Sequence, residues 1–258
     1  MRLTLYCGPL TRYYAHDWPG SPASDALPPL SRIESLACGW RDMACQAALD
    51  AVGEPVYWEE SPDGACVTAE PGWEGWYGLL LWALYRDQQR KPEPLPADWL
   101  ERLETLPVFQ AAQKRDACRY PTVAANCEMF LPYDADVVLT GPDPAGEEEI
   151  PIGSAAQLLR ELEALNRDTW KASEAEIASW EALENGKGGR DLDCFAKRGF
   201  AALLRVARAA VSMTQPIRLD YDVLSPIRCK TLLDGGRRRT KNLYGVFKRT
   251  VPAGQVRQ

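Results

Sequence analysis

The feature that most constrains the fold is the run WEGWYGLLLWALY at residues 73–85, the densest apolar stretch of the chain. Helical spacing places most of its large side chains on one continuous face, namely Trp73, Trp76, Tyr77, Leu80, Leu81 and Leu84. Leu79 and Trp82 widen this face beyond half of the circumference, and a helix that is apolar almost all round is buried in a core or spans a membrane. The run is shorter than the roughly twenty residues of a span. It therefore predicts a buried central helix.

Three further helices are predicted to begin at capping boxes, in which a serine and the Glu or Gln three residues later satisfy free backbone N–H groups. The pairs are Ser31 with Glu34, Ser154 with Gln157, and Ser173 with Glu176. The first of these helices should end at Gly53 and bury one face, consisting of Ile33, Leu36, Ala37, Trp40, Ala44, Ala47, Ala48 and Ala51. A fourth long helix is predicted from Asp191 or Asp193 to about Ser212.

Short strands are predicted between these helices. Alternating or β-branched segments indicate strands at residues 2–6, 55–58, 127–131, 135–140, 150–152 and 217–221, with a hairpin over 136–152. Shorter helices are expected after Asp98 and over 109–117, and a loop over 61–70. Because helices and strands do not alternate regularly, a doubly wound parallel sheet is not favoured. The pattern predicts an α+β fold, dominated by helices, with one small mixed sheet packed around the central helix.

The chain of 258 residues is long enough to bury a core without disulfide bonds. Its amino end does not have the pattern of a signal peptide, and no segment is long enough to cross a bilayer, so we expect a cytoplasmic protein with no membrane partner. The eight cysteines should then be reduced thiols. No pair is spaced C-x-x-C and the only histidine is His16, so we expect no metal site.

The charge of the chain changes sign near residue 226. Residues 226–258 carry nine basic side chains and one acid, a net charge of +8, whereas the whole chain carries −6, which leaves −14 for residues 1–225. We interpret residues 1–225 as a single globular domain and residues 226–258 as a basic tail. The tail has three interpretations: an arm that binds nucleic acid through Arg237, Arg238, Arg239 and Lys241, a segment that lies on the acidic body, or a frayed end.

Catalytic candidates are few. Cys7 follows the first strand, and His16 and Asp17 come shortly after it, so a thiolate activated by His16 and oriented by Asp17 is one hypothesis. A buried cysteine with a structural histidine explains the same residues.

Two aspartate pairs are spaced i, i+2, which places both members on one face of an extended segment. These are Asp134 with Asp136 and Asp220 with Asp222, and they could hold Mg²⁺ or divide acid and base roles; solvated turn residues are the alternative. The segment Gly-Lys-Gly-Gly at 186–189 lacks the remaining residues of a phosphate-binding P-loop. We therefore expect no cofactor.

Several segments resemble those of an uncharacterised group of bacterial cytoplasmic proteins: LYCGPLTRYY, GWYGLLLWALY, FLPYD and IPIGSAAQLLRELEALNRDTW. The resemblance covers about residues 2–221, leaves out the basic tail, and implies no functional residue. In its acidic, tryptophan-rich composition the chain is also similar to the immunity proteins that neutralise bacterial toxins.

These observations favour a non-catalytic, cytoplasmic protein-binding protein, with an immunity protein as the specific form. Its acidic body would cover a basic surface on a toxin or enzyme, since opposite fields accelerate association and select partners. The alternatives are an enzyme of unknown class that uses Cys7 and His16 or the aspartate pairs, and a nucleic-acid-binding protein that uses the basic tail.

Overall fold

The computed structural model describes residues 2–21, 27–115, 117–143, 149–183 and 191–221. Its elements follow the order β1 (Leu3–Cys7), α1 (Leu10–Tyr14), α2 (Leu30–Val52), β2 (Val67–Ala69), α3 (Gly72–Asp87), η1 (Leu103–Thr105), α4 (Pro107–Ala112), α5 (Pro121–Ala124), β3 (Met129–Leu131), β4 (Leu139–Pro142), β5 (Glu149–Ser154), α6 (Ala155–Asp168), α7 (Glu174–Trp180), α8 (Leu192–Met213) and β6 (Ile217–Tyr221). The predicted α+β class, with helices dominant and a mixed sheet, is confirmed.

The six strands of the described residues form one sheet in the order β2-β1-β6-β3-β5-β4. Only β3 and β5 pair in parallel; the other neighbours are antiparallel. β6 lies between β1 and β3, so it joins the two halves of the sheet. The segment 217–221 was predicted as a strand with these same bounds.

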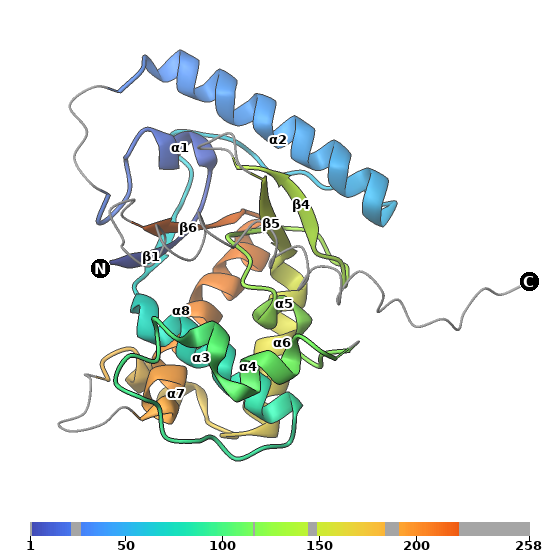
Figure 1. Cartoon of the computed structure of the whole chain (residues 1–258). Coiled ribbons are helices and arrows are strands. Elements are labelled where there is room, and N and C mark those ends of the chain that lie inside the picture. The colour runs from blue at the N-terminus through green and yellow to red at the C-terminus, as the bar shows by residue number, and fades with distance from the viewer. Residues whose placement is uncertain (1, 22–26, 116, 144–148, 184–190, 222–258) are drawn as a thin grey trace, which may run out of the picture.

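Helices cover both faces of the sheet (Figure 1). Alternate residues of the strands point to opposite faces, and those of β3 show the division. Phe130 lies in the apolar cluster that contains α6 and α8, whereas Met129 and Leu131 lie in the cluster that contains Trp40 of α2. The helices α3, α4, α6, α7 and α8 lie on one side of the sheet, and α1 and α2 lie on the other.

The central helix is confirmed as α3, and α8 is its main neighbour. Three glycines allow the helices to come close: Gly75 of α3 lies against Gly199 of α8, and a Cβ on Gly78 of α3 would lie 2.6 Å from that of Phe195 of α8. Tryptophans of α3 pack into the core, Trp73 against Tyr77 and Trp76 with its indole N–H donating to Asn126 at 2.7 Å. The close approach explains why glycines occupy positions 75 and 78 inside this largely apolar helix.

Most helix starts follow the sequence prediction. Ser154 accepts a hydrogen bond from the Gln157 N–H, Ser173 and Glu176 form a complete capping box, and Asp191 caps α8. The capping box predicted for Ser31 and Glu34 is wrong: the N-cap of α2 is Pro29, two residues earlier, and the helix has no side-chain cap. Pro29 has a non-helical ψ of 143° and lies just outside the helix, where its carbonyl oxygen accepts the N–H groups of Arg32 and Ile33. The predicted stop at Gly53 is confirmed, with φ 80°.

Several short elements differ from the prediction. Residues 55–58 form no strand, because no neighbouring strand pairs with them. Trp58 is nevertheless buried, and its indole N–H donates to Glu60 at 2.7 Å. The predicted loop 61–70 contains β2, whereas α1 and α5 were not predicted. The helix expected after Asp98 is replaced by turns and η1, and the helix predicted over 109–117 is the shorter α4. The hairpin predicted over 136–152 is present as β4 and β5.

Candidate protein-binding surface

The helix α2 contacts the rest of the protein through a narrow strip. Its buried residues are Ile33, Ala37, Trp40, Ala44 and Ala48, which recur every three or four positions. Three of the five are alanines, whose small side chains let the helix rest close to the sheet while burying little of its circumference. Trp40 is the anchor, with its ring 6.3 Å from that of Trp58. Most of the circumference of α2 therefore faces solvent, as a ridge on the outside of the molecule (Figure 1).

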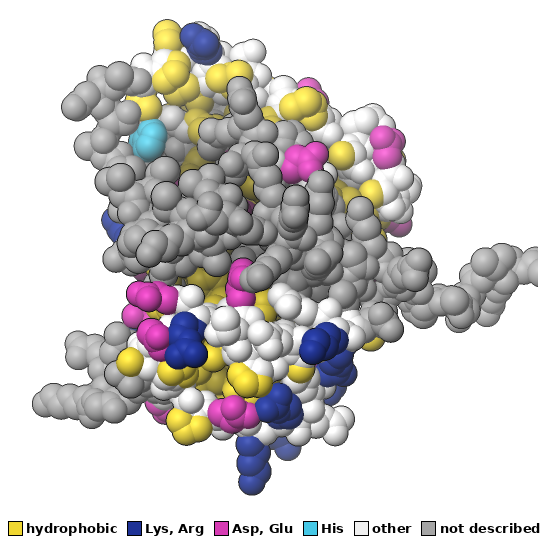
Figure 2. All heavy atoms as spheres, viewed as in Figure 1, with side chains coloured by type: hydrophobic (Ala, Val, Ile, Leu, Met, Phe, Trp, Pro, Cys, Tyr) yellow, Lys and Arg dark blue, Asp and Glu magenta, His cyan; other side chains and the backbone are white. Residues whose placement is uncertain are grey.

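Figure 2 shows apolar side chains over this ridge as well as over the lower half of the molecule, but the large exposed ones gather on and beside the ridge. Seven large apolar side chains are exposed in the described part of the chain, and six of them belong to residues 27–57. They are Leu27, Leu30, Leu36, Met43, Leu49 and Tyr57; the seventh is Val211 on α8. The prediction that Leu36, Ala47 and Ala51 are buried is wrong, since all three are exposed. Leu36 retains 61% of its accessible surface, Met43 57% and Tyr57 62%.

The exposed apolar residues lie on both flanks of the ridge. Leu36 and Met43 are seven residues apart and share one flank, by the geometry of a helix with 3.6 residues per turn. Leu49, six residues after Met43, points to the opposite flank by the same helical geometry. Tyr57 lies beside that second flank, where the guanidinium of Arg41 stacks 4.8 Å from the centre of its ring. We call this set, together with the acids described next, the α2 surface.

Acidic groups are interspersed with the apolar side chains. Residues 27–59 contain two arginines and five carboxylates, a net charge of −3. Asp42 lies on the crest and pairs with Arg41 at 2.8 Å, and Asp50 accepts a hydrogen bond from Gln46 at 2.8 Å. The negative end of the helix dipole lies at the C-terminus of α2, beside Asp50 and Glu54. The last turn of α2 has no basic residue that would offset this negative charge. The surface therefore combines apolar area with a negative field that is strongest at its C-terminal end.

The catalytic hypothesis for Cys7, His16 and Asp17 receives no support from their surroundings. Cys7 is fully buried, and burial raises the pKa of its thiol to about 12, with Cys66 adding to the effect. His16 and Asp17 are exposed; the His16 ring contacts the Ser21 hydroxyl at 3.0 Å, and Asp17 pairs with Arg12. A buried neutral thiol is a poor nucleophile.

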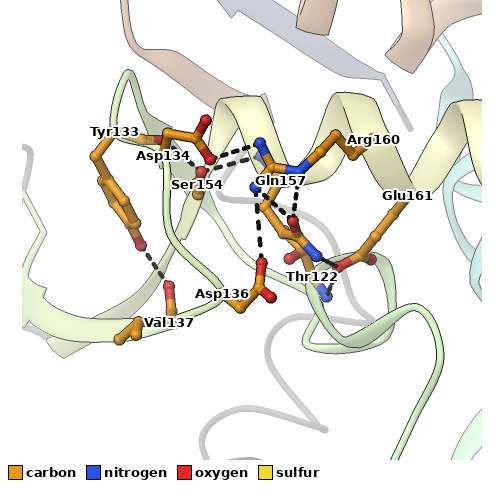
Figure 3. Close-up of polar contacts among 9 residues, drawn as sticks. All are labelled: Thr122, Tyr133, Asp134, Asp136, Val137, Ser154, Gln157, Arg160 and Glu161. Atoms are coloured by element: carbon orange, nitrogen blue, oxygen red, sulfur yellow. Dashed lines mark hydrogen bonds and ion pairs between the residues drawn. The ribbon is translucent and has the colours of Figure 1, made fainter. Parts of the chain in front are cut away.

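The first aspartate pair is engaged by an arginine (Figure 3). Arg160 of α6 pairs with Asp134 at 2.5 Å and lies 3.7 Å from Asp136, and its guanidinium also donates to Gln157. Both aspartates are largely exposed. In the described residues, no group of three or more His, Cys, Asp or Glu side chains is arranged to hold a metal ion.

Next to this pair, Glu161 is buried with a structural role (Figure 3). Its two oxygens accept the backbone N–H groups of Thr122 and Val123, both at 3.0 Å, and thereby bind the start of α5. Burial raises the pKa of Glu161 to about 7, although these hydrogen bonds act in the opposite direction.

The second aspartate pair is only partly described, because Asp222 lies outside the described residues. Asp220 accepts the hydroxyl of Tyr13 at 2.7 Å and so links β6 to α1. Beside it on β6, Arg218 is only 4% exposed and pairs with Asp143 at 2.9 Å. Burial alone would lower the pKa of Arg218, but the nearby Asp143 and the two tyrosines of α1 raise this pKa above its usual value. Sequence patterns did not reveal this ion pair, because its members are 75 residues apart.

The basic residues Arg237, Arg238, Arg239 and Lys241 lie outside the described residues. Among the described helices, none is both long enough and apolar enough to cross a membrane.

Comparison with known proteins adds no relative: no family model, no curated protein and no solved structure matches the chain. The resemblance to bacterial cytoplasmic proteins therefore stays a prediction, and any functional proposal depends on the surface itself.

Proposed function

We propose that this chain is a non-catalytic, cytoplasmic protein-binding protein whose α2 surface docks onto a basic protein. The observation that carries the proposal is the concentration of six of the seven exposed large apolar side chains at residues 27–57. Scattered apolar residues are normal on a protein surface, whereas a gathered set marks an interaction site. The net charge of −3 over residues 27–59 favours a positively charged partner.

The immunity protein is the specific form of this proposal. An acidic protein that covers the basic surface of a toxin would need steering by charge and a central apolar contact, and the α2 surface offers both. The charge of −14 over residues 1–225 extends the favourable field beyond the contact itself.

The test uses the full chain, tagged and expressed in its native host, in two forms besides the wild type. One form carries Leu36→Glu with Met43→Glu in the α2 surface, and the control carries Val211→Glu, at the exposed apolar residue on α8. We expect wild type and control to enrich the same basic protein, and the double variant to recover at least ten-fold less of it. Equal recovery by all three forms, or enrichment of no protein, would contradict the proposal.

The immunity form has its own measurement. Expression of the enriched partner alone should arrest growth of the host, and co-expression of the wild type, but not of the double variant, should restore it. A partner that is harmless on its own would leave a protein-binding function and remove the immunity form.

A further inference from the structure

We infer that α2 binds in a groove on the partner protein. The floor of the groove is apolar, and its rim carries basic residues, which are concentrated opposite the C-terminal end of α2. This inference rests on the proposed protein-binding function and names the kind of partner that fits it.

The shape of the partner follows from where the apolar side chains lie. A flat partner could cover only one side of a helix. Leu36 and Met43 are on one flank of α2, while Leu49 and Tyr57 are on or beside the other, and each is at least 36% exposed. Burial of both sets requires a surface that wraps around the helix. An amphipathic helix in a groove is a common mode of protein recognition.

The way α2 is attached leaves room for such a partner. Its contact with the sheet uses the alanine strip described above, and Gly39, on the outward side, has no atom within 4 Å of the position of a Cβ. A helix of 23 residues is about 35 Å long, so a groove of ordinary dimensions can follow it over several turns. The ridge is thus accessible without any rearrangement of the core.

The charges give the groove a direction. At the end of α2, Asp50 and Glu54 add to the negative end of the helix dipole, and the last turn has no basic side chain. At the start of the helix, the positive charge of Arg32 offsets the negative charge of Glu34. Basic residues of the partner should therefore gather opposite Asp50 and Glu54 rather than opposite Glu34.

The first experiment places a photoreactive amino acid singly at Leu36, Leu49 or Val211 of the full chain in its host. We expect the positions on both flanks, Leu36 and Leu49, to cross-link to the same protein, with Val211 negative. The peptide of the partner that is captured from Leu49 should be rich in Lys and Arg.

The outcomes separate the inference from the function on which it rests. Cross-linking from one flank only would overturn the groove and leave a protein-binding surface. Cross-linking to a second copy of this chain alone, or to nothing, would overturn both.

A second experiment tests the direction of the groove with the isolated partner. Asp50→Lys combined with Glu54→Lys should weaken binding at least ten-fold and reduce its dependence on salt, whereas Glu34→Lys should change the affinity less than three-fold. Equal effects of the two changes would contradict the assigned direction.

Discussion

Gly199 of α8 lies against the backbone of Gly75 of α3, so closely that a Cβ on Gly199 would overlap the Gly75 carbonyl group. The obstacle is backbone, which cannot swing away as the end of a side chain can. The crossing of these two helices therefore leaves no room for a methyl group on Gly199.

Gly199→Ala should destabilise the protein by about 3 kcal/mol or more, because overpacking a core forces the backbone to move. The matched control is Gly39→Ala on α2, where a Cβ meets no atom within 4 Å. Since alanine is the better helix former, the control should gain about 0.5–1 kcal/mol. Urea denaturation of both variants measures the difference, and similar midpoints for the two would show that α3 and α8 are not in close contact.

Replacing Glu161 with glutamine should change how stability depends on pH. The folded-state pKa of Glu161 is raised from 4.5 to about 7, so the folded protein binds the proton more tightly than the unfolded chain does. The stabilisation from this proton is complete below pH 4.5 and is lost as the pH rises to 7, by up to about 3 kcal/mol. Glu161→Gln should remove this loss.

The control for Glu161 is Glu163→Gln, an exposed carboxylate on the same helix. Its stability profile between pH 5 and 8 should follow that of the wild type. If Glu161→Gln follows the wild type as well, the Glu161 carboxyl does not titrate in this window.

The buried pair of Arg218 and Asp143 can be tested by a double-mutant cycle. Asp143→Asn should cost about 3–5 kcal/mol, because it leaves the guanidinium of Arg218 buried without its counter-charge. Arg218→Met in the Asp143→Asn background should restore part of that loss, since it removes the unpaired charge. Free energies of unfolding for the four proteins give the coupling energy, and purely additive costs would show that the two side chains act independently.

Two of the serines that the sequence predicted as helix caps give the smallest but most direct comparison. Ser173→Ala should cost about 1 kcal/mol, because the Ser173 side chain accepts the Glu176 N–H and caps α7. Ser31→Ala should change stability by less than about 0.5 kcal/mol, because Ser31 lies inside α2 and caps nothing. Thermal unfolding distinguishes the two, and an equal loss in both would restore the capping role that the sequence predicted for Ser31.

These cases show which features sequence patterns can predict. Local rules worked where neighbours in sequence decide the outcome: the cap at Ser173, the stop at Gly53 and the apolar run of α3 were all recognised. The start of α2 was missed because Pro29 offered an alternative that the serine pattern did not consider.

The candidate surface was beyond local rules for a different reason. Periodicity indicated an apolar face on α2, but it could not tell how wide a strip the sheet would cover. The structure buries Ala37 and Ala44 and leaves Leu36 and Met43 outside, which is visible only when both partners in the packing are known. In the same way, the contact between Arg218 and Asp143 depends on the arrangement of strands that are distant in sequence.

The place of β6 in the sheet has a consequence for synthesis on the ribosome. β1 and β2 are made early, and β3, β4 and β5 follow, but the strand that bridges them ends only at Tyr221. Until that strand emerges, the nascent chain holds two incomplete ribbons, each with an open edge that can recruit a foreign strand. We therefore expect the topology to make folding during translation depend on chaperones, rather than to weaken the folded protein.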